Sequence, residues 1–96
     1  PGIGFGKTLE HNLVLTRQLH RFHALGTPVL YGPSRKRFLG ELTGKEAHER
    51  DIATAAVVAL GIEFGADIVR IHNPAICGDA VKVARALAAL GGSLPA

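Results

Sequence analysis

The sequence has one cysteine, no methionine and no tryptophan, and aromatic residues make up only 5% of its 96 positions. The single cysteine, Cys77, excludes an intramolecular disulfide and leaves a cysteine-based zinc site without partners. No apolar run approaches the roughly 18 residues of a membrane-spanning helix, and no charged-then-apolar signal segment opens the chain. These absences predict a cytoplasmic protein without a membrane partner.

The charge and the length of the chain limit its partners. The formal net charge is +3 at pH 7, and so small an excess is typical of a solvated surface, so we expect no nucleic-acid partner. The composition is 47% hydrophobic, which is rich for a chain that can bury only a small core. We therefore expect its apolar faces to meet further parts of a larger protein, and the turn-like opening over residues 1–4 favours a fragment.

Three blocks of the sequence follow one plan, in which a β-branched run leads through a glycine- or proline-marked loop to a helical pattern. In the first block the strand is missing, and Thr8 is predicted to cap a helix that ends before Gly26. The second block predicts a strand over residues 28–31, a basic loop over 34–37 and a helix over 49–64.

The third block predicts a strand over residues 68–72 and a helix that is clearest over 80–90. Two openings of that helix are compatible with the sequence. Either the Asn-Pro pair at 73–74 caps it, with the proline in the first helical position, or Asp79 does.

Strands that alternate with helices imply parallel strands and an α/β fold. Two complete strands leave open sheet edges and cannot bury both faces of the sheet, so an element that closes the sheet is missing. A (β/α)8 barrel of about 250 residues would supply it. We therefore expect residues 1–96 to be the carboxy-terminal portion of an incomplete TIM barrel, made of its last βα units, with a flexible tail over 93–96.

Three loops are candidates for a site, because ligands of parallel sheets lie at the carboxyl ends of the strands. The loop over residues 2–7 alternates glycine with other residues, which permits either an anion-binding nest of N–H groups or simply a tight turn. The loop over 32–37 carries three consecutive cations that face either solvent or an anion. The third loop covers 72–74.

Arg70 and His72 share one face of the third block's strand, because side chains alternate along a strand. An arginine in an aliphatic strand favours a phosphate or carboxylate partner, although an internal salt bridge with His72 as a bystander is an alternative. With Lys36 these residues are expected to form a phosphate site. The other histidines lack ligand spacing toward His72, so we expect no metal site built by this chain alone: His11, His20, His23 and His48.

Three ordered motifs carry a resemblance to a known family. They are Pro-Gly-Ile-Gly-Phe-Gly-Lys over residues 1–7, Gly-Pro-Ser-Arg-Lys over 32–36 and Arg-Ile-His over 70–72. Together they resemble dihydropteroate synthase over essentially the whole chain. The resemblance implies a folate-biosynthesis transferase that joins 4-aminobenzoate to 7,8-dihydropterin pyrophosphate and releases pyrophosphate. It also implies a homodimer, and a Mg²⁺ cofactor whose protein ligand lies outside this chain.

The same resemblance implies roles for individual residues. Lys36, Arg70 and His72 would be catalytic, with Arg70 and His72 holding the pyrophosphate and Lys36 bonding the pterin ring, on which Arg70 also stacks. Phe5 and Ser34 would line the 4-aminobenzoate pocket, with Lys7 near it. The implied substrate-binding set is Phe5, Lys7, Gly32, Ser34, Arg35, Lys36, Arg70 and His72.

Two departures from the family pattern are present. Asn73 stands where the family usually has aspartate, and the pterin-binding aspartate expected just before residue 1 is absent, so we expect the chain alone to be inactive. Two alternatives remain open: a pterin-binding methyltransferase barrel, and a non-catalytic module for anion binding or dimerisation.

Overall fold

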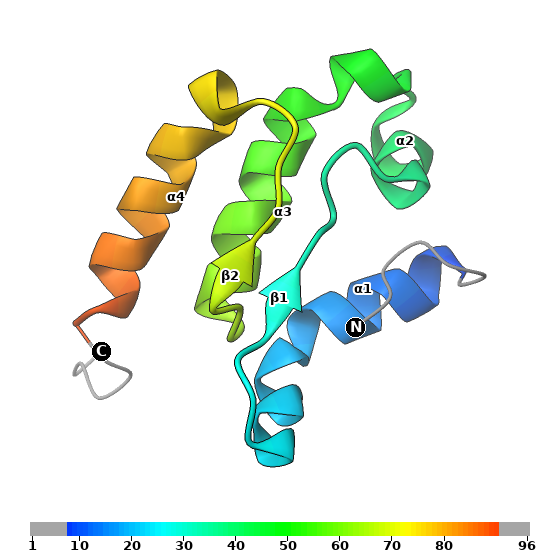
Figure 1. The fold of residues 1–96 in the computed structure, drawn as a ribbon. Coiled ribbons are helices and arrows are strands. Elements are labelled where there is room, and N and C mark those ends of the chain that lie inside the picture. Colours follow the sequence, from blue (N-terminus) through cyan, green and yellow to red (C-terminus); the bar gives the residue numbers. More distant parts are fainter. Residues whose placement is uncertain (1–7, 91–96) are drawn as a thin grey trace.

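The structure is a computed structural model in which residues 8–90 are described (Figure 1). The predicted loop over 1–7 and tail over 93–96 lie outside the described residues. Two strands alternate with helices along the chain, as the sequence predicts. In order, the elements are α1 Leu9–Arg17, the 3-10 helix η1 Leu19–Leu25, β1 Leu30–Tyr31, α2 Arg37–Thr43, the 3-10 helix η2 Ala47–Glu49, α3 Asp51–Glu63, β2 Ile68–Val69 and α4 Pro74–Ala88.

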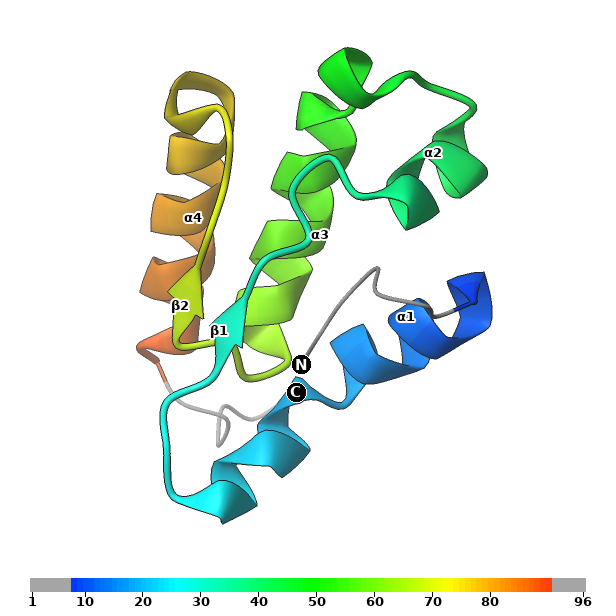
Figure 2. The same ribbon diagram turned by 45° about the vertical axis from the view of Figure 1, so that its right-hand side comes forward.

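The two strands pair in parallel, which confirms the predicted α/β class. Leu30 lies opposite Ile68, and Tyr31 lies opposite Val69. The pairing continues past the short strands, since the N–H of Arg70 donates to the carbonyl of Tyr31 at 3.1 Å. The chain crosses from β1 to β2 through α2 and α3, and the strands run side by side in both views (Figures 1 and 2).

Helices cover one face of this sheet. Tyr31 is fully buried there, in a core cluster with Leu19 and Phe38, while Val69 packs against that cluster and against a second one around Val58. On the opposite face, Leu30 and Ile68 remain 48% and 49% exposed. The sheet is therefore buried on one side only within residues 8–90.

The helix predicted between Thr8 and Gly26 begins and ends as expected. The hydroxyl of Thr8 accepts a hydrogen bond from the N–H of His11, and Gly26 adopts a left-handed φ of 79°. The prediction of one continuous helix was wrong at Gln18, where α1 gives way to η1. The backbone N–H of His20 there donates to the carbonyl of Phe64 at 2.8 Å, a tertiary bond that competes with the helical one.

Helix α2 was not predicted. The predicted basic loop over 34–37 is one residue too long, because Arg37 begins this helix. The helix is held by Phe38 and Leu39, which are 2% and 3% exposed. It ends at Gly44 with a left-handed φ of 73°. Seven residues with two adjacent buried side chains are too few to give a clear helical period.

Helix α3 confirms the helix predicted over 49–64. It begins two residues later and ends one residue earlier than predicted. Its interior glycine has a packing reason. A Cβ on Gly61 would lie 2.6 Å from the ring of Tyr31, so the glycine lets the helix approach the strand closely. No helix among the described residues is long and apolar enough to cross a membrane.

Helix α4 begins at the Asn-Pro pair, which settles the alternative left open by the sequence. The side-chain oxygen of Asn73 accepts a hydrogen bond from the N–H of Ile76 at 3.2 Å, and Pro74 occupies the first helical position. A proline is favourable there because that position has no intrahelical partner for an N–H. Asp79 lies within the helix.

Candidate anion-binding site at the strand ends

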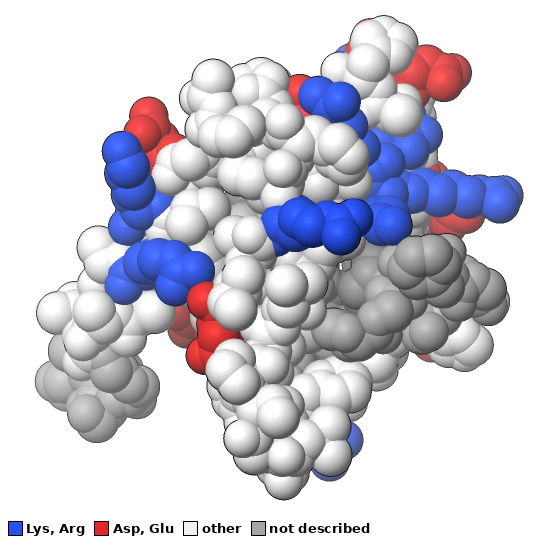
Figure 3. Space-filling model, in the orientation of Figure 1, with Lys and Arg blue, Asp and Glu red and all other residues white. Residues whose placement is uncertain are grey.

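Arg70 and His72 lie on the uncovered side of the sheet, as their spacing predicts. The intervening Ile71, like Val69, packs into the helix-facing clusters, whereas Arg70 and His72 are exposed. Gly32 leaves room beside them, since a Cβ there would lie 3.9 Å from the Cβ of Arg70. Lys and Arg side chains form a band across the middle of this side of the molecule (Figure 3).

A pair of hydrogen bonds joins the loops that follow the two strands. The hydroxyl oxygen of Ser34 lies 2.7 Å from Nδ1 of His72 and accepts a bond from the backbone N–H of His72 at 3.0 Å. Ser34 is only 5% exposed. Because one ring nitrogen of His72 is held by Ser34, the orientation of the imidazole is fixed and the other nitrogen is left for a ligand.

The side chain of Arg35 points into the protein, toward α3. Its Nε and Nη2 atoms donate to the two carboxylate oxygens of Asp51 at 2.8 and 3.0 Å. Its backbone has a positive φ of 57°, which is unfavourable for a residue with a side chain, and its N–H donates to the hydroxyl of Thr54 at 3.0 Å. The start of α3 thus holds both the backbone and the side chain of this loop residue.

Asp51 also binds the loop after β2. Its Oδ2 atom accepts a bond from the amide of Asn73 at 3.2 Å. The Arg35 hydrogen bond lowers the pKa of the Asp51 carboxyl against the opposing effect of burial, and Asn73 and His72 lower it further. Cys77, which is fully buried, donates from Sγ to the Asp51 carbonyl at 3.6 Å, and burial raises the pKa of this thiol.

Of the three consecutive cations predicted to face solvent or an anion, Arg37 faces solvent. Its side chain is 89% exposed and its Nε lies 3.4 Å from Glu41 one turn along α2. Lys36, which caps α2 in an extended conformation, is partly buried. The guanidinium of Arg70 has no hydrogen-bond or ion-pair partner within residues 8–90, so the predicted alternative of an internal salt bridge has no support there.

The structure therefore brings together Gly32, Ser34, Arg70 and His72, and it turns Arg35 toward Asp51. The implied site residues Phe5 and Lys7 lie outside the described residues. The individual substrate contacts of all these residues stay predictions. Sequence reasoning missed Asp51 and Thr54, which at the start of a helix look like an ordinary acidic first-turn residue and a helix-interior threonine.

The described part of the chain offers no cluster suited to a metal ion. Across residues 8–90, no three side chains of histidine, cysteine, aspartate or glutamate gather at a distance that would hold one. Asp51, a carboxylate bonded to both strand-end loops, accepts bonds from Arg35 and Asn73. The residues described here do not fit a magnesium site of their own.

Comparison with known proteins identifies the family. The family model described as pterin binding enzyme matches residues 1–72. The chain belongs to this family. A dihydropteroate synthase of Synechocystis sp. is 47% identical over 88 residues, which covers 91% of this chain and 30% of that protein. The chain spans about a third or less of the length of such curated relatives.

Solved structures of pterin binding enzymes agree. Dihydropteroate synthase from Stenotrophomonas maltophilia superposes with a TM-score of 0.86 at 46% identity, covering 95% of this chain and 35% of that one. The Thermus thermophilus enzyme matches at 43% identity over 91% of this chain. It does so in complex with 6HMPPP, with a TM-score of 0.82 and 35% of that chain covered, and in complex with 4-aminobenzoate, with 0.83 and 34%.

Proposed function

We propose that this chain forms part of a dihydropteroate synthase, in which the loops after β1 and β2 bind the pyrophosphate of 7,8-dihydropterin pyrophosphate. The relatives that carry this name, and the Thermus thermophilus complexes with 6HMPPP and 4-aminobenzoate, support the proposal. The reaction would join 4-aminobenzoate to the pterin and release pyrophosphate in folate biosynthesis.

One observation carries the proposal for this site. The Ser34 hydroxyl joins the two strand-end loops through His72, and it does so beside an arginine whose guanidinium is unpaired within residues 8–90. An arginine and an oriented imidazole on one face of a sheet provide donors for a pyrophosphate, and the arginine binds phosphate oxygens bidentately.

In this mechanism the protein stabilises the leaving group. The C–O bond between the pterin methylene and the pyrophosphate opens, the electron pair leaves with the pyrophosphate, and Arg70 and His72 stabilise the charge that grows on its oxygens. The amine of 4-aminobenzoate then forms the new C–N bond and loses a proton. Lys36 would hydrogen-bond the pterin ring, and Ser34 would contribute by holding His72.

We further propose that the sheet is part of a (β/α)8 barrel that residues 8–90 do not close. Leu30 and Ile68 are half exposed on the uncovered face, and in a barrel such side chains point to the interior and pack in layers. The chain alone would then be inactive. Magnesium stays a prediction, with its protein ligand expected outside this chain. A cytoplasmic location stays a prediction as well.

Calorimetric titration tests the proposed site. The chain should bind pyrophosphate weakly, and Arg70→Ala should abolish this binding, whereas Arg21→Ala should preserve it. Arg21 is also exposed, and its side chain donates to Gln18 near the start of η1, before β1, so it controls for the loss of charge. Equal losses in both variants, or tighter and salt-sensitive binding to a short DNA duplex, would contradict the proposal.

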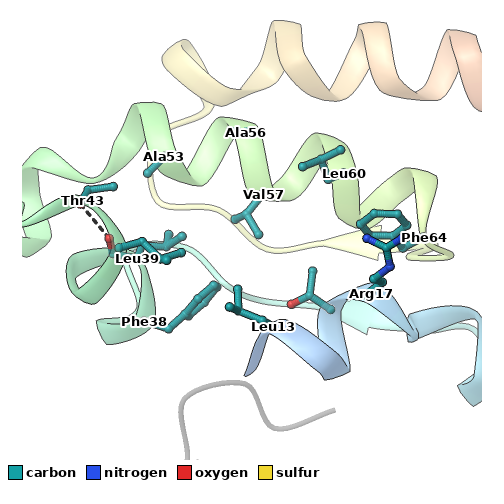
Figure 4. A pocket seen from close by; sticks show the side chains of 12 residues that line it. Leu13, Arg17, Phe38, Leu39, Thr43, Ala53, Ala56, Val57, Leu60 and Phe64 are labelled. Atoms are coloured by element: carbon teal, nitrogen blue, oxygen red, sulfur yellow. Dashed lines mark hydrogen bonds between the residues drawn. The ribbon is translucent and has the colours of Figure 1, made fainter. Parts of the chain in front are cut away.

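Homodimerisation is proposed through the helical face. A mainly apolar groove lies between α1, α2 and α3 and is lined by Leu13, Phe38 and Leu60 among others (Figure 4). A second lies between α3 and α4, where Val83 and Leu87 are each 61% exposed. Because Leu60 lines both grooves, one partner surface could cover the two together, and we assign that surface to a second copy of the protein.

Sedimentation tests this assignment. Leu60→Glu should shift the protein toward the monomer, because a charge would be buried against apolar side chains. Ile52→Glu is the matched control, since Ile52 is 80% exposed and lines neither groove. A wild-type protein that sediments as a monomer at all concentrations would overturn the proposal, as would a Leu60→Glu dimer as stable as the Ile52→Glu dimer.

A further inference from the structure

Three links tie the start of α3 to the loops that follow both strands. Asp51 binds the guanidinium of Arg35 on one side and the amide of Asn73 on the other, with donor–acceptor distances of 2.8, 3.0 and 3.2 Å. Thr54, one turn later, binds the backbone N–H of Arg35. Ser34 and Lys36 flank Arg35, and His72 precedes Asn73, so the linked positions are neighbours of the proposed site residues.

We propose that Asp51 is a positioning residue, which fixes the separation of the loops carrying Ser34, Lys36 and His72 so that their side chains meet one anion. This inference rests on the proposed pyrophosphate site and goes beyond it. The carboxylate does not touch the anion. It acts through Arg35 and Asn73, in the way that outer groups orient the ligands of a metal.

The geometry of Arg35 shows why a fixed anchor is needed. Its left-handed φ of 57° is a conformation that favours glycine, so the loop would relax if nothing held it. The bidentate ion pair of Arg35 with Asp51 fixes the orientation of the side chain better than a single hydrogen bond would. Arg50 adds a further bond from the same end of α3, donating from Nη1 to the Arg35 carbonyl at 3.0 Å.

Asn73 suits this position because an amide can do two things at once. Its oxygen accepts the bond from Ile76 that caps α4, and its nitrogen donates to Asp51. A carboxylate at residue 73 would cap the helix equally well but could not donate to a second carboxylate. Through the asparagine, the Asp51 carboxylate at the start of α3 also holds the start of α4.

The test compares Asp51→Asn with the wild type in two measurements. Pyrophosphate affinity, measured by calorimetry, should fall roughly ten- to a hundredfold, the range typical of lost outer-shell partners. The ¹⁵N signal of His72 Nδ1 and the backbone amides around Ser34 should also shift, because the loops move apart. The matched control is Asp67→Asn, which removes a carboxylate that accepts a backbone N–H from Val29 at the opposite end of β2.

A milder variant keeps the test decisive if Asp51→Asn fails to fold. Asn73→Ser preserves a good helix cap but removes the amide that donates to Asp51, and it should produce a smaller change of the same kind. Folded variants with wild-type affinity and an unchanged His72 signal would overturn the inference. If the wild type binds no pyrophosphate, the proposed function fails, and the His72 signal alone still decides whether Asp51 positions the loops.

Discussion

The hydroxyl oxygen of Ser34 lies 2.7 Å from Nδ1 of His72 and 3.0 Å from the backbone nitrogen of the same residue. One buried side chain thus holds both the ring and the main chain of a residue 38 positions away. The contact joins the end of one strand to the end of its neighbour. It makes the histidine, which is exposed to solvent, a rigid part of the sheet's edge.

Ser34→Ala should therefore lower both stability and affinity. Removing the hydroxyl leaves the backbone N–H of His72 without its acceptor, which should cost about 1–3 kcal/mol of unfolding free energy in urea titrations. Pyrophosphate binding should weaken because the imidazole is no longer oriented. Thr43→Ala is the control, since it removes another hydroxyl, bound to the Leu39 carbonyl, away from the strand ends. A variant that loses stability but binds pyrophosphate normally would contradict the orienting role.

Two glycines in helices should respond oppositely to alanine. A Cβ on Gly61 would lie 2.6 Å from the Tyr31 ring, so Gly61→Ala should destabilise the protein by about 1–3 kcal/mol through overpacking. Gly78 in α4 has nothing within 4 Å of an added Cβ, so Gly78→Ala should stabilise by up to about 1 kcal/mol through helix propensity. Thermal unfolding measures both. Equal signs for the two substitutions would show that helix propensity, not contact with Tyr31, decides the effect at Gly61.

Local signals in the sequence predicted the ends of the first helical segment and offered Asn73 as one of two caps for α4. Thr8, Gly26 and Asn73 act through bonds within four residues, which the sequence displays directly. The strands are shorter than predicted, since β1 covers Leu30–Tyr31 and β2 covers Ile68–Val69. The alternation of strands and helices predicted parallel pairing, because a helical crossover joins parallel strands. The register, with Tyr31 beside Val69, places both side chains against the helix-facing cluster, a relationship that the local signals did not display.

Contacts between distant residues account for what the sequence did not predict. The break at Gln18 follows from a bond between His20 and Phe64, far along the chain. The inward turn of Arg35 depends on Asp51, 16 positions later. The sequence of a run of cations does not show whether each side chain faces solvent, an anion or an internal carboxylate. Only the fold shows that Arg35 binds Asp51 whereas Arg37 faces solvent.

The carboxyl of Asp67 should make the protein sensitive to acid. It accepts the N–H of Val29 at 2.7 Å and lies 2.9 Å from Nε2 of His23. The Val29 bond, and then His23, lower the pKa of Asp67 below its ordinary 3.8. A carboxyl with a lowered folded pKa contributes stability above its unfolded pKa, and this contribution is lost as the pH falls below about 3.8.

Asp67→Asn checks this dependence, because an amide oxygen can still accept the Val29 bond but does not titrate. Thermal midpoints measured from about pH 6 down to about pH 3 should fall more steeply for the wild type than for the variant. Parallel curves would mean that the native carboxyl titrates as it does in the unfolded chain, and the prediction would then be wrong.

Tyr31 should produce the opposite dependence at high pH. Burial, opposed in part by the Thr16 hydrogen bond, raises the pKa of its phenol from 10.0 to about 12. Its oxygen lies 2.7 Å from the Thr16 hydroxyl, which donates to the Asn12 carbonyl at 2.8 Å. Thr16 could therefore donate a hydrogen bond to a phenolate only by losing its bond to Asn12. Because the folded pKa is the higher one, the contribution to stability is complete below pH 10 and is lost as the pH rises toward 12.

Tyr31→Phe removes the titrating group and should remove this loss. Between about pH 8 and about pH 12, the wild type should lose up to roughly 3 kcal/mol of unfolding free energy more than the variant, since each unit of pKa difference corresponds to about 1.4 kcal/mol. The sequence contains one tyrosine, so ultraviolet absorbance of the phenolate follows Tyr31 directly. Ionisation of the folded protein near pH 10 would contradict the burial of its hydroxyl between α1 and α3, because a phenol that meets water titrates there.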